Sequence, residues 1–269
     1  MPEAVLPKIL GILNITKDSF SDGGKYLAPE KAIAHGKKLM EEGADILDLG
    51  PASSHPEAEA VSVADEGRRL RAVMPVLQKQ GGVLSVDSFH PETQRLAMGQ
   101  GVEWLNDISG FPHTEFYGEL AKANCSLIVM HAVSLSHKAV VRDIDKGALW
   151  EHLIAFFEKR ISALTKAGVS EKRLVLDPGM GFFLGKASEN SLFILSQLSE
   201  IKKKFGLPLL VSVSRKSFLQ KITNRPASQT LYASLAAELY AISQGADYIR
   251  THEPAPLCQY LRFREAIGS

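Results

Sequence analysis

The feature that most constrains the fold is an alternation, repeated about eight times, of short apolar runs with longer segments of helical period. The short runs are rich in Val, Ile and Leu and almost continuously apolar, which is typical of parallel strands covered on both faces. Strands are predicted at residues 9–15, 45–50, 83–87, 104–108, 127–130, 173–176, 209–214 and 248–251. This number of strand–helix units favours a closed (β/α)8 TIM barrel over an open sheet.

The longer segments carry the end signals and the apolar stripes of helices. A helix over residues 29–42 is predicted from Pro29 at its start and Gly43 at its end. Residues 148–166 place Leu149, Leu153 and Phe157 on one face. The chain has 269 residues, close to the roughly 250 of one such barrel, and no linker or repeat divides it. Residues 1–269 are therefore predicted to form a single domain.

Charge and cysteine content exclude several classes of protein. The chain has 31 Lys and Arg against 30 Asp and Glu, so no basic excess is available to neutralise a nucleic-acid backbone. Cys125 and Cys258 show neither metal-ligand spacing nor a disulfide framework. No apolar stretch approaches the roughly 18 residues of a membrane span, and the first residues do not read as a secretion signal. We expect a cytoplasmic protein without nucleic-acid or membrane partners.

Polar residues follow nearly every apolar run, and this pattern carries the functional signal. Parallel barrel strands point the same way, so their carboxyl ends meet at one mouth, where such enzymes hold their sites. The residues at these ends are Asn14, Asp48, Ser53, Ser54, Asp87, Asn106, Asp107, His131, Asp177, Ser214, Arg215, Lys216, Arg250 and His252. Any one carboxylate here is more often a helix cap than a ligand, but all of them converging on one place predicts a site.

The chemistry of these residues suggests the kind of ligand. Lys216, Arg250 and His252 supply positive charge for an anionic group. Asp87 and Asp177 are acceptors for paired N–H donors of a heterocycle. No His, Cys or Asp cluster predicts a metal site built by protein alone, but Mg²⁺ held by phosphates and one side-chain oxygen fits the pattern.

Short strings spread over nearly the whole chain resemble those of dihydropteroate synthases. They read GILNIT (11–16), DSFSDGG (18–24), SVDS (85–88), NDI (106–108), VMH (129–131), LDPG (176–179), SRKS (214–217) and IRTH (249–252). Each string is weak alone, and their order along the chain makes the signal strong. The resemblance implies condensation of 6-hydroxymethyl-7,8-dihydropterin pyrophosphate with p-aminobenzoate, giving 7,8-dihydropteroate and pyrophosphate.

The resemblance also implies roles for the residues that match its motifs. The pterin is assigned to Asp87, Asn106, Ile108, Asp177 and Lys216. The pyrophosphate is assigned to Asn14, Ser54, Arg250 and His252, with Asn14 next to Mg²⁺. The p-aminobenzoate is assigned to Ser214, Arg215, Lys216, Ser217, Phe182 and Phe183. The catalytic residues are then Asp87, Lys216, Arg250 and His252, and the family implies a homodimer formed through helices near the C-terminus.

The sequence departs from the usual family pattern in two loops. Ser54 and His55 stand where the family usually has Thr and Arg, which puts that arginine's role in closing the site in doubt. The string GMGFFLG (179–185) replaces a shorter Gly-Phe-Gly run. Both loops, with GFP (110–112) and YL (26–27), resemble the mobile sulfonamide-resistant branch of the family. Resistance is expected to come from a relocated aromatic side chain, Phe182 or Phe183.

Other interpretations of the same residues stay open. The string at 18–24 suits a plain solvent loop as well as the mobile lid that the family implies. His131 reads equally as a core histidine bonded to backbone, Asp107 as a cap, and Asp48 as a support for neighbouring loops. The rival functions are a pterin-dependent methyltransferase, which has no need of the SRKS string, and a non-catalytic pterin-binding subunit.

Overall fold

The strands form one parallel sheet that curls into a barrel. The computed structural model describes residues 6–16, 29–52, 59–133 and 144–268. The strands are β1 Lys8–Asn14, β2 Ile46–Gly50, β3 Leu84–Asp87, β4 Trp104–Asp107, β5 Ser126–Met130, β6 Leu174–Asp177, β7 Leu210–Val211 and β8 Tyr248–Thr251. Their order is β6-β5-β4-β3-β2-β1-β8-β7, and every pair is parallel. The barrel predicted from the sequence is confirmed.

The seam between β6 and β7 departs from the prediction. A strand was expected over 209–214, but β7 covers only Leu210–Val211. The seam is closed by one isolated parallel bridge between Leu176 and Leu209. The backbone then leaves the sheet and reaches Arg215, whose φ of 58° lies in the left-handed region. Ser212, Val213 and Ser214 stay buried although their backbone has left the sheet.

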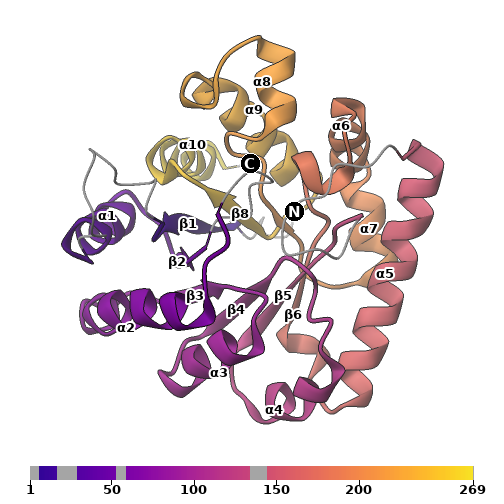
Figure 1. The fold of residues 1–269 in the computed structure, drawn as a ribbon. Coiled ribbons are helices and arrows are strands. Elements are labelled where there is room, and N and C mark those ends of the chain that lie inside the picture. Colours follow the sequence, from indigo (N-terminus) through magenta and orange to yellow (C-terminus); the bar gives the residue numbers. More distant parts are fainter. Residues whose placement is uncertain (1–5, 17–28, 53–58, 134–143, 269) are drawn as a thin grey trace.

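Helices surround the strands on the outside (Figure 1). They are α1 Pro29–Glu41, α2 Val63–Lys79, α3 Pro91–Gly99, α4 Tyr117–Lys122, α5 Lys146–Lys166, α6 Ser188–Ser196, α7 Leu198–Phe205, α8 Ser217–Thr223, α9 Leu231–Ser243 and α10 Pro254–Ala266. Caps define several starts: the Ser62 hydroxyl accepts from Asp65 N–H, and the Asp145 carboxylate from Ala148 N–H. None of the described helices is both long and apolar enough to cross a bilayer.

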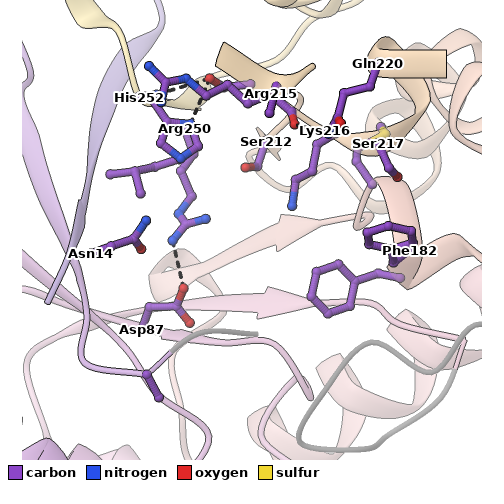
Figure 2. Close-up of a pocket in the computed structure, with 16 residues that line it drawn as sticks. Asn14, Asp87, Phe182, Ser212, Arg215, Lys216, Ser217, Gln220, Arg250 and His252 are labelled. Atoms are coloured by element: carbon purple, nitrogen blue, oxygen red, sulfur yellow. Dashed lines mark hydrogen bonds and ion pairs between the residues drawn. The ribbon is translucent and has the colours of Figure 1, made fainter. Parts of the chain in front are cut away.

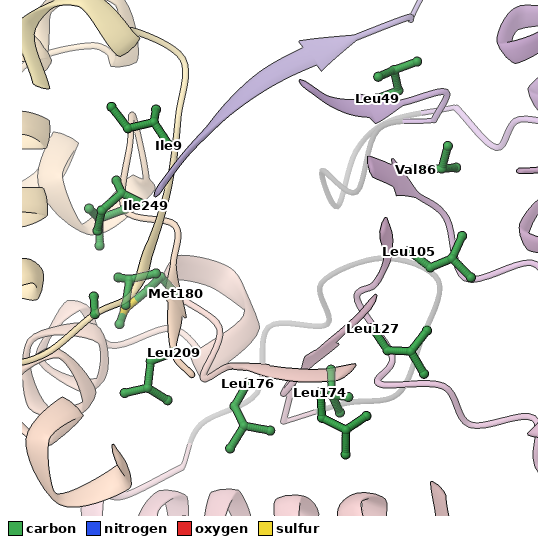
Figure 3. Packing of buried hydrophobic residues seen from close by; sticks show 14 of the residues in the cluster. Ile9, Leu49, Val86, Leu105, Leu127, Leu174, Leu176, Met180, Leu209 and Ile249 are labelled. Carbon is green, nitrogen blue, oxygen red and sulfur yellow. The ribbon is translucent and has the colours of Figure 1, made fainter. Parts of the chain in front are cut away.

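The period of two along each strand divides the buried side chains into two sets. One set points outward and packs under the helices, as Leu49, Leu105, Leu127 and Ile249 show in Figure 3. The other set fills the inside of the barrel. It consists of Leu10, Ile46, Ile128, Val175 and Leu210 with Trp104 and Tyr248 packed against them, and we call it the plug. The plug closes the interior below the mouth, so a ligand approaches only from the carboxyl ends of the strands.

Candidate active site

The mouth of the barrel contains a cavity of about 410 Å³ that adjoins a narrow, deeper pocket. The outer cavity is lined by Ile12, Asn14, Ala52, Asp87, Met180, Phe182, Phe183, Ser212, Ser214, Arg215, Lys216, Ser217, Gln220, Ala227, Arg250 and His252. The inner pocket is lined by Asp87, Asn106, Ile108, Met130, Asp177, Gly179, Met180, Phe183, Ser212, Lys216 and Arg250. Since six residues line both, the two form one continuous site (Figure 2).

The structure brings the predicted site residues together. Every described residue to which the resemblance assigned a ligand lines the outer cavity, the inner pocket or both, whereas the strand-end residues Asp48, Asp107 and His131 line neither. Asp177 and Arg250 lie in the same inner pocket, although 73 positions separate them in the chain (250 − 177). Ser54 and His55 lie outside the described residues, as does the string at 18–24.

Strand geometry explains why these residues meet. Alternate residues of a strand face the same side, so the residue two positions after a plug residue also faces the barrel interior, one layer nearer the mouth. Asn106 follows Trp104 in this way, Asp177 follows Val175 and Arg250 follows Tyr248. Ser212 follows Leu210 in the same way and lines both parts of the site, although it was not among the predicted residues; the alternation of the strand is the signal that points to it.

Arg250 is held between two carboxylates at the base of the cavity. Its Nε donates to Asp48 Oδ2 and its Nη2 to Asp87 Oδ2, at 2.5 and 2.8 Å (Figure 2 shows the Asp87 contact). Burial opposes the charge on Arg250, but Asp48 and Asp87 outweigh it and hold its pKa above the ordinary value. Burial raises the pKa of Asp87 to about 7, against the opposing effect of Arg250. The base of the site therefore holds a fixed cation and a carboxyl group that titrates near neutrality.

Lys216 enters the site from the loop that follows β7. It is the N-terminal cap of α8, and its side chain points into the cavity in Figure 2. Burial lowers the pKa of Lys216 to about 8, and the charge of Arg250 adds to the effect. The Nζ atom lies 5.2 Å from the centre of the Phe183 ring, within cation–π range.

Asp177 ends β6 and lines the inner pocket. Its Oδ1 accepts the Gly179 N–H at 2.8 Å. Burial raises the pKa of Asp177 to about 6, although this hydrogen bond opposes the rise. His131 supports the same turn, because its backbone N–H donates to Asp177 O and its Nδ1 lies 3.1 Å from Pro178 O. The interpretation of His131 as a core histidine bonded to backbone is confirmed.

His252 differs from the expectation of a positive charge. Its Nδ1 lies 3.0 Å from Ser214 Oγ, which also accepts the His252 backbone N–H. Burial lowers the pKa of His252 to about 3, and the neighbouring Arg215 lowers it further. The imidazole is therefore neutral in this cavity at pH 7, since nothing in the described site compensates its charge.

Arg215 lines the outer cavity, but its side chain is tied to the protein. Its Nη2 pairs with Glu253 Oε1 at 2.5 Å, and its backbone N–H donates to Ser234 Oγ. A non-glycine residue in the left-handed region costs on the order of 1 kcal/mol, and these contacts offset that cost. Arg215 thus fixes the turn that delivers Lys216 and Ser217 to the site.

The two aromatic residues after β6 occupy different depths. They belong to a short 3-10 turn, Gly181–Leu184. Phe183 packs with Ile108, Met130 and Ala132 and lines both parts of the site, whereas Phe182 lines only the outer cavity. The first residue of this turn lies against α8, since a Cβ placed on Gly181 would come within 3.4 Å of Ser217 Oγ.

Asn14 is the one candidate metal ligand that the sequence suggested. It ends β1 and lines the outer cavity, and its Oδ1 lies over Gly50, where a Cβ would approach to 3.2 Å. No group of three or more His, Cys, Asp or Glu suited to a metal ion occurs among the described residues. The site therefore fits Mg²⁺ only when phosphate oxygens supply most of its ligands.

Asp107 lies next to the site without lining it. Its Oδ1 accepts Ser109 N–H and its Oδ2 accepts from Gln94 Nε2. Burial raises the pKa of Asp107 to about 6, although these hydrogen bonds oppose the rise. Asp107 therefore caps the segment after β4, which is one of the two interpretations that the sequence left open.

Comparison with known proteins identifies the class of protein to which the chain belongs. The family model described as "Pterin binding enzyme" matches residues 10–252. The chain is 54% identical over 249 residues to a type-2 dihydropteroate synthase of Escherichia coli, covering 93% of this chain and 92% of that one. It is 47% identical to a type-1 dihydropteroate synthase of the same organism, covering 97% and 94%.

A solved structure agrees with these relatives. The dihydropteroate synthase of Xanthomonas albilineans in complex with 7,8-dihydropteroate superposes with a TM-score of 0.85 at 33% identity, covering 98% of this chain and 94% of that one. The site described above thus lies in the barrel of a pterin binding enzyme. The chain belongs to the dihydropteroate synthases and is a transferase.

Proposed function

We propose that the mouth of this barrel condenses 6-hydroxymethyl-7,8-dihydropterin pyrophosphate with p-aminobenzoate, with the residue roles given below. One observation carries the assignment: an inner pocket with buried carboxylates opens into an outer cavity that holds a helix start, and the cations Arg250 and Lys216 line both parts. A ligand with a donor-rich ring and a phosphate tail matches both ends. The structure of the Xanthomonas albilineans enzyme in complex with 7,8-dihydropteroate supports this class of ligand.

The inner pocket is assigned to the pterin ring. Asp177 has a second carboxylate oxygen available for ring N–H groups, since Gly179 takes the first. Asn106 faces the same pocket from β4, and Ile108 and Met130 supply apolar surface to the ring. Lys216 donates a hydrogen bond to the ring from the loop that follows β7. Buried acceptors reject a ring that lacks the matching donors, because each unpaired group costs about 1–3 kcal/mol.

Bond breaking is assigned to charge placement around the methylene carbon. When the C–O bond to pyrophosphate breaks, positive charge develops on the methylene and negative charge on the leaving group. Asp87 stabilises the first charge and Arg250 the second, in a site with little water. His252 and Asn14 lie on the same rim and complete the pyrophosphate site, with Ser54 assigned there from the resemblance alone. Mg²⁺ bound to the pyrophosphate and Asn14 would neutralise further negative charge on the leaving group.

The p-aminobenzoate is assigned to the outer cavity. Its amine attacks the methylene carbon and its carboxylate lies at Ser217, the first residue of α8. Lys216 flanks the aryl ring and Phe182 forms the facing wall. Ser214 and Arg215 act through the backbone turn that positions this helix start. No protein nucleophile is needed, because the amine of the substrate attacks directly.

Sulfonamide discrimination is assigned to the turn at 181–184. Phe182 lines only the outer cavity and packs against the apolar cluster of the inner pocket from outside, whereas Phe183 is a buried member of that cluster and lines both parts of the site. Phe182 is therefore placed to clash with the tetrahedral sulfonyl group while admitting a flat carboxylate. A thousandfold preference needs about 4 kcal/mol, which is within the range of one steric conflict.

Two variants test this discrimination. Phe182→Ala and a turn shortened to Gly-Phe-Gly are expected to gain inhibition by sulfamethoxazole while they keep turnover of p-aminobenzoate. Active variants that stay insensitive to the drug would contradict the assignment.

The proposal also covers the oligomeric state of the chain and its location in the cell. A homodimer is proposed through α9 and α10, because Tyr232, Phe263 and Ile267 are 84%, 63% and 62% exposed there. Light scattering of the purified chain tests this, and Phe263→Asp is expected to shift a dimer to monomers. A cytoplasmic location stays a proposal from the sequence.

Turnover decides among the functions. Release of pyrophosphate that depends on p-aminobenzoate is expected from the purified chain, and repeating the assay with a sulfonamide measures resistance. A pterin methyltransferase would show methyl transfer from methyltetrahydrofolate instead. A non-catalytic subunit would bind pterin pyrophosphate in calorimetry without turnover.

A further inference from the structure

Asp48 lies at the boundary between the plug and the mouth. It is fully buried on β2, two residues after the plug residue Ile46. Its Oδ2 accepts from Arg250 Nε and from Asn106 Nδ2, at 2.5 and 3.1 Å. Its Oδ1 has no hydrogen-bond partner among the described residues. One buried oxygen thus joins two residues that line the inner pocket, while Asp48 itself lines neither part of the site.

The contact with Asp48 fixes which way the Asn106 amide faces. A carboxylate is an acceptor only, so the group turned towards it must be the amide NH₂. The amide oxygen, Asn106 Oδ1, is then left buried and without a protein partner. An unpaired buried acceptor is costly unless a ligand satisfies it. Asn106 therefore presents an acceptor, and a ligand must offer an N–H there.

The second contact fixes the plane of the Arg250 guanidinium. Asp48 takes Nε on one side and Asp87 takes Nη2 on the other. A guanidinium is planar, so two such contacts determine its orientation.

We propose that Asp48 is a positioning residue of the pterin site, which holds the Asn106 amide with its oxygen towards the ring and holds Arg250 across the base of the cavity. This inference rests on the proposed function, since it concerns recognition of the same ring. Asp48 thereby leaves the Asn106 oxygen as an acceptor in the same pocket as the Asp177 carboxylate. It selects rings that carry N–H groups along the facing edge.

The test uses binding of the ring without its phosphates, because the change of charge at residue 48 also alters attraction for pyrophosphate. The probe is 6-hydroxymethyl-7,8-dihydropterin, measured by calorimetry. Asp48→Asn is expected to weaken binding about tenfold or more, the size of one lost hydrogen bond to a buried group. The KM for p-aminobenzoate is expected to change less than the KM for the pterin substrate.

A matched control lies on the adjacent strand. Ser85 is the register partner of Asp48 on β3 and is equally buried, but its hydroxyl has no hydrogen-bond partner among the described residues. Ser85→Ala is expected to bind the probe as the unchanged protein does. A loss as large as that of Asp48→Asn would show that any change in this layer disturbs the pocket and would overturn the proposal.

A swap of the two residues separates positioning from folding. Asn106→Asp alone places two buried carboxylates together and is expected to bind the probe worst. In the double variant Asp48→Asn/Asn106→Asp, the residue at 48 donates and the residue at 106 still offers an acceptor to the ring. The double variant is expected to bind more tightly than the product of the two single effects predicts.

Each outcome decides one question. Single effects that simply multiply, or an Asp48→Asn variant that binds as well as the unchanged protein, would overturn the role of Asp48. If Asp48→Asn fails to fold by thermal melting, the double variant is compared with Asn106→Asp alone, and a double variant that binds the probe no better than Asn106→Asp would overturn the role of Asp48. Absence of p-aminobenzoate-dependent turnover in the unchanged protein would instead overturn the proposed function.

Discussion

The two ends of the barrel interior are built by the same strands but do different work. The plug below consists of apolar side chains such as Leu10, Ile128 and Val175, and the layer above carries Asp48, Asn106 and other polar groups. The plug contributes to stability through buried apolar surface. The mouth buries carboxylates whose raised pKa values show that burial disfavours their charge. A shift of two residues along a strand separates stabilisation from function.

The largest effect is expected from removing one charged group of the mouth. Lys216→Ala or Asp177→Ala should lower kcat/KM by about 10³-fold or more, because each loses a buried, charge-assisted contact with substrate. The thermal midpoint should stay close to that of the unchanged protein, since the plug is intact. Steady-state kinetics with differential scanning fluorimetry check both. Activity within tenfold of the unchanged protein would contradict the role of the mouth.

The plug is expected to respond in the opposite way. Ile128→Ala should lower the free energy of unfolding by about 2–5 kcal/mol, the usual cost of a large-to-small change in a core. Ile222→Ala is a matched control, because Ile222 is 55% exposed and should cost less than about 0.5 kcal/mol. Urea titration measures both. If Ile128→Ala costs no more than its control, the plug is not the stabilising layer.

Asp177 in the mouth should contribute to the pH dependence of stability. The pKa of Asp177 is about 6 in the folded chain, above the ordinary value of 3.8, so the folded state binds more protons between these values. Stability is therefore expected to fall as pH rises from about 4 to 6, by on the order of 1–3 kcal/mol for this group.

The variant Asp177→Asn isolates this contribution. It should flatten the pH dependence and be more stable than the unchanged protein at pH 7, because no buried charge forms. Ile128→Ala should keep the original slope at a lower stability. Chemical denaturation at several pH values makes the comparison, and an unchanged slope in Asp177→Asn would rule the explanation out.

The smallest effect is expected at the boundary of the two layers. Ser212 is buried, and its hydroxyl has no hydrogen-bond partner among the described residues. Removing an unsatisfied hydroxyl is close to neutral, so Ser212→Ala should change the free energy of unfolding by less than about 1 kcal/mol. The variant should raise the KM of a substrate only if that substrate forms a hydrogen bond with the Ser212 hydroxyl. A large loss of stability would show that the hydroxyl has a partner in the folded chain.

Much of this molecule follows from local sequence. The apolar runs predicted the strands to within about a residue or two at most ends, because parallel strands buried on both faces must be apolar throughout. The exception was β7, which ends at Val211 although the chain stays buried as far as Ser214. Burial is visible in composition, but hydrogen bonding to a neighbouring strand is not.

The site residues were found from sequence because each lies at a strand end, and all strand ends of a barrel share one mouth. Their hydrogen-bond and ion-pair partners could not be predicted from the sequence. The expected charge of His252 was wrong because its burial beside Ser214 and Arg215 is a tertiary property. Asp48 was assigned to neighbouring loops, whereas it contacts Arg250 and Asn106, 202 and 58 positions away.

The sequence by itself determined the barrel, the family and the set of polar groups at the mouth, because periodicity and residue order are local properties of a chain. Only the tertiary structure decided which of these groups are charged, which are paired and which way Asn106 faces. The physical reason is that pKa values and hydrogen bonds depend on burial and on distances across the barrel. Those distances are set when β2, β4 and β8 come together around one pocket.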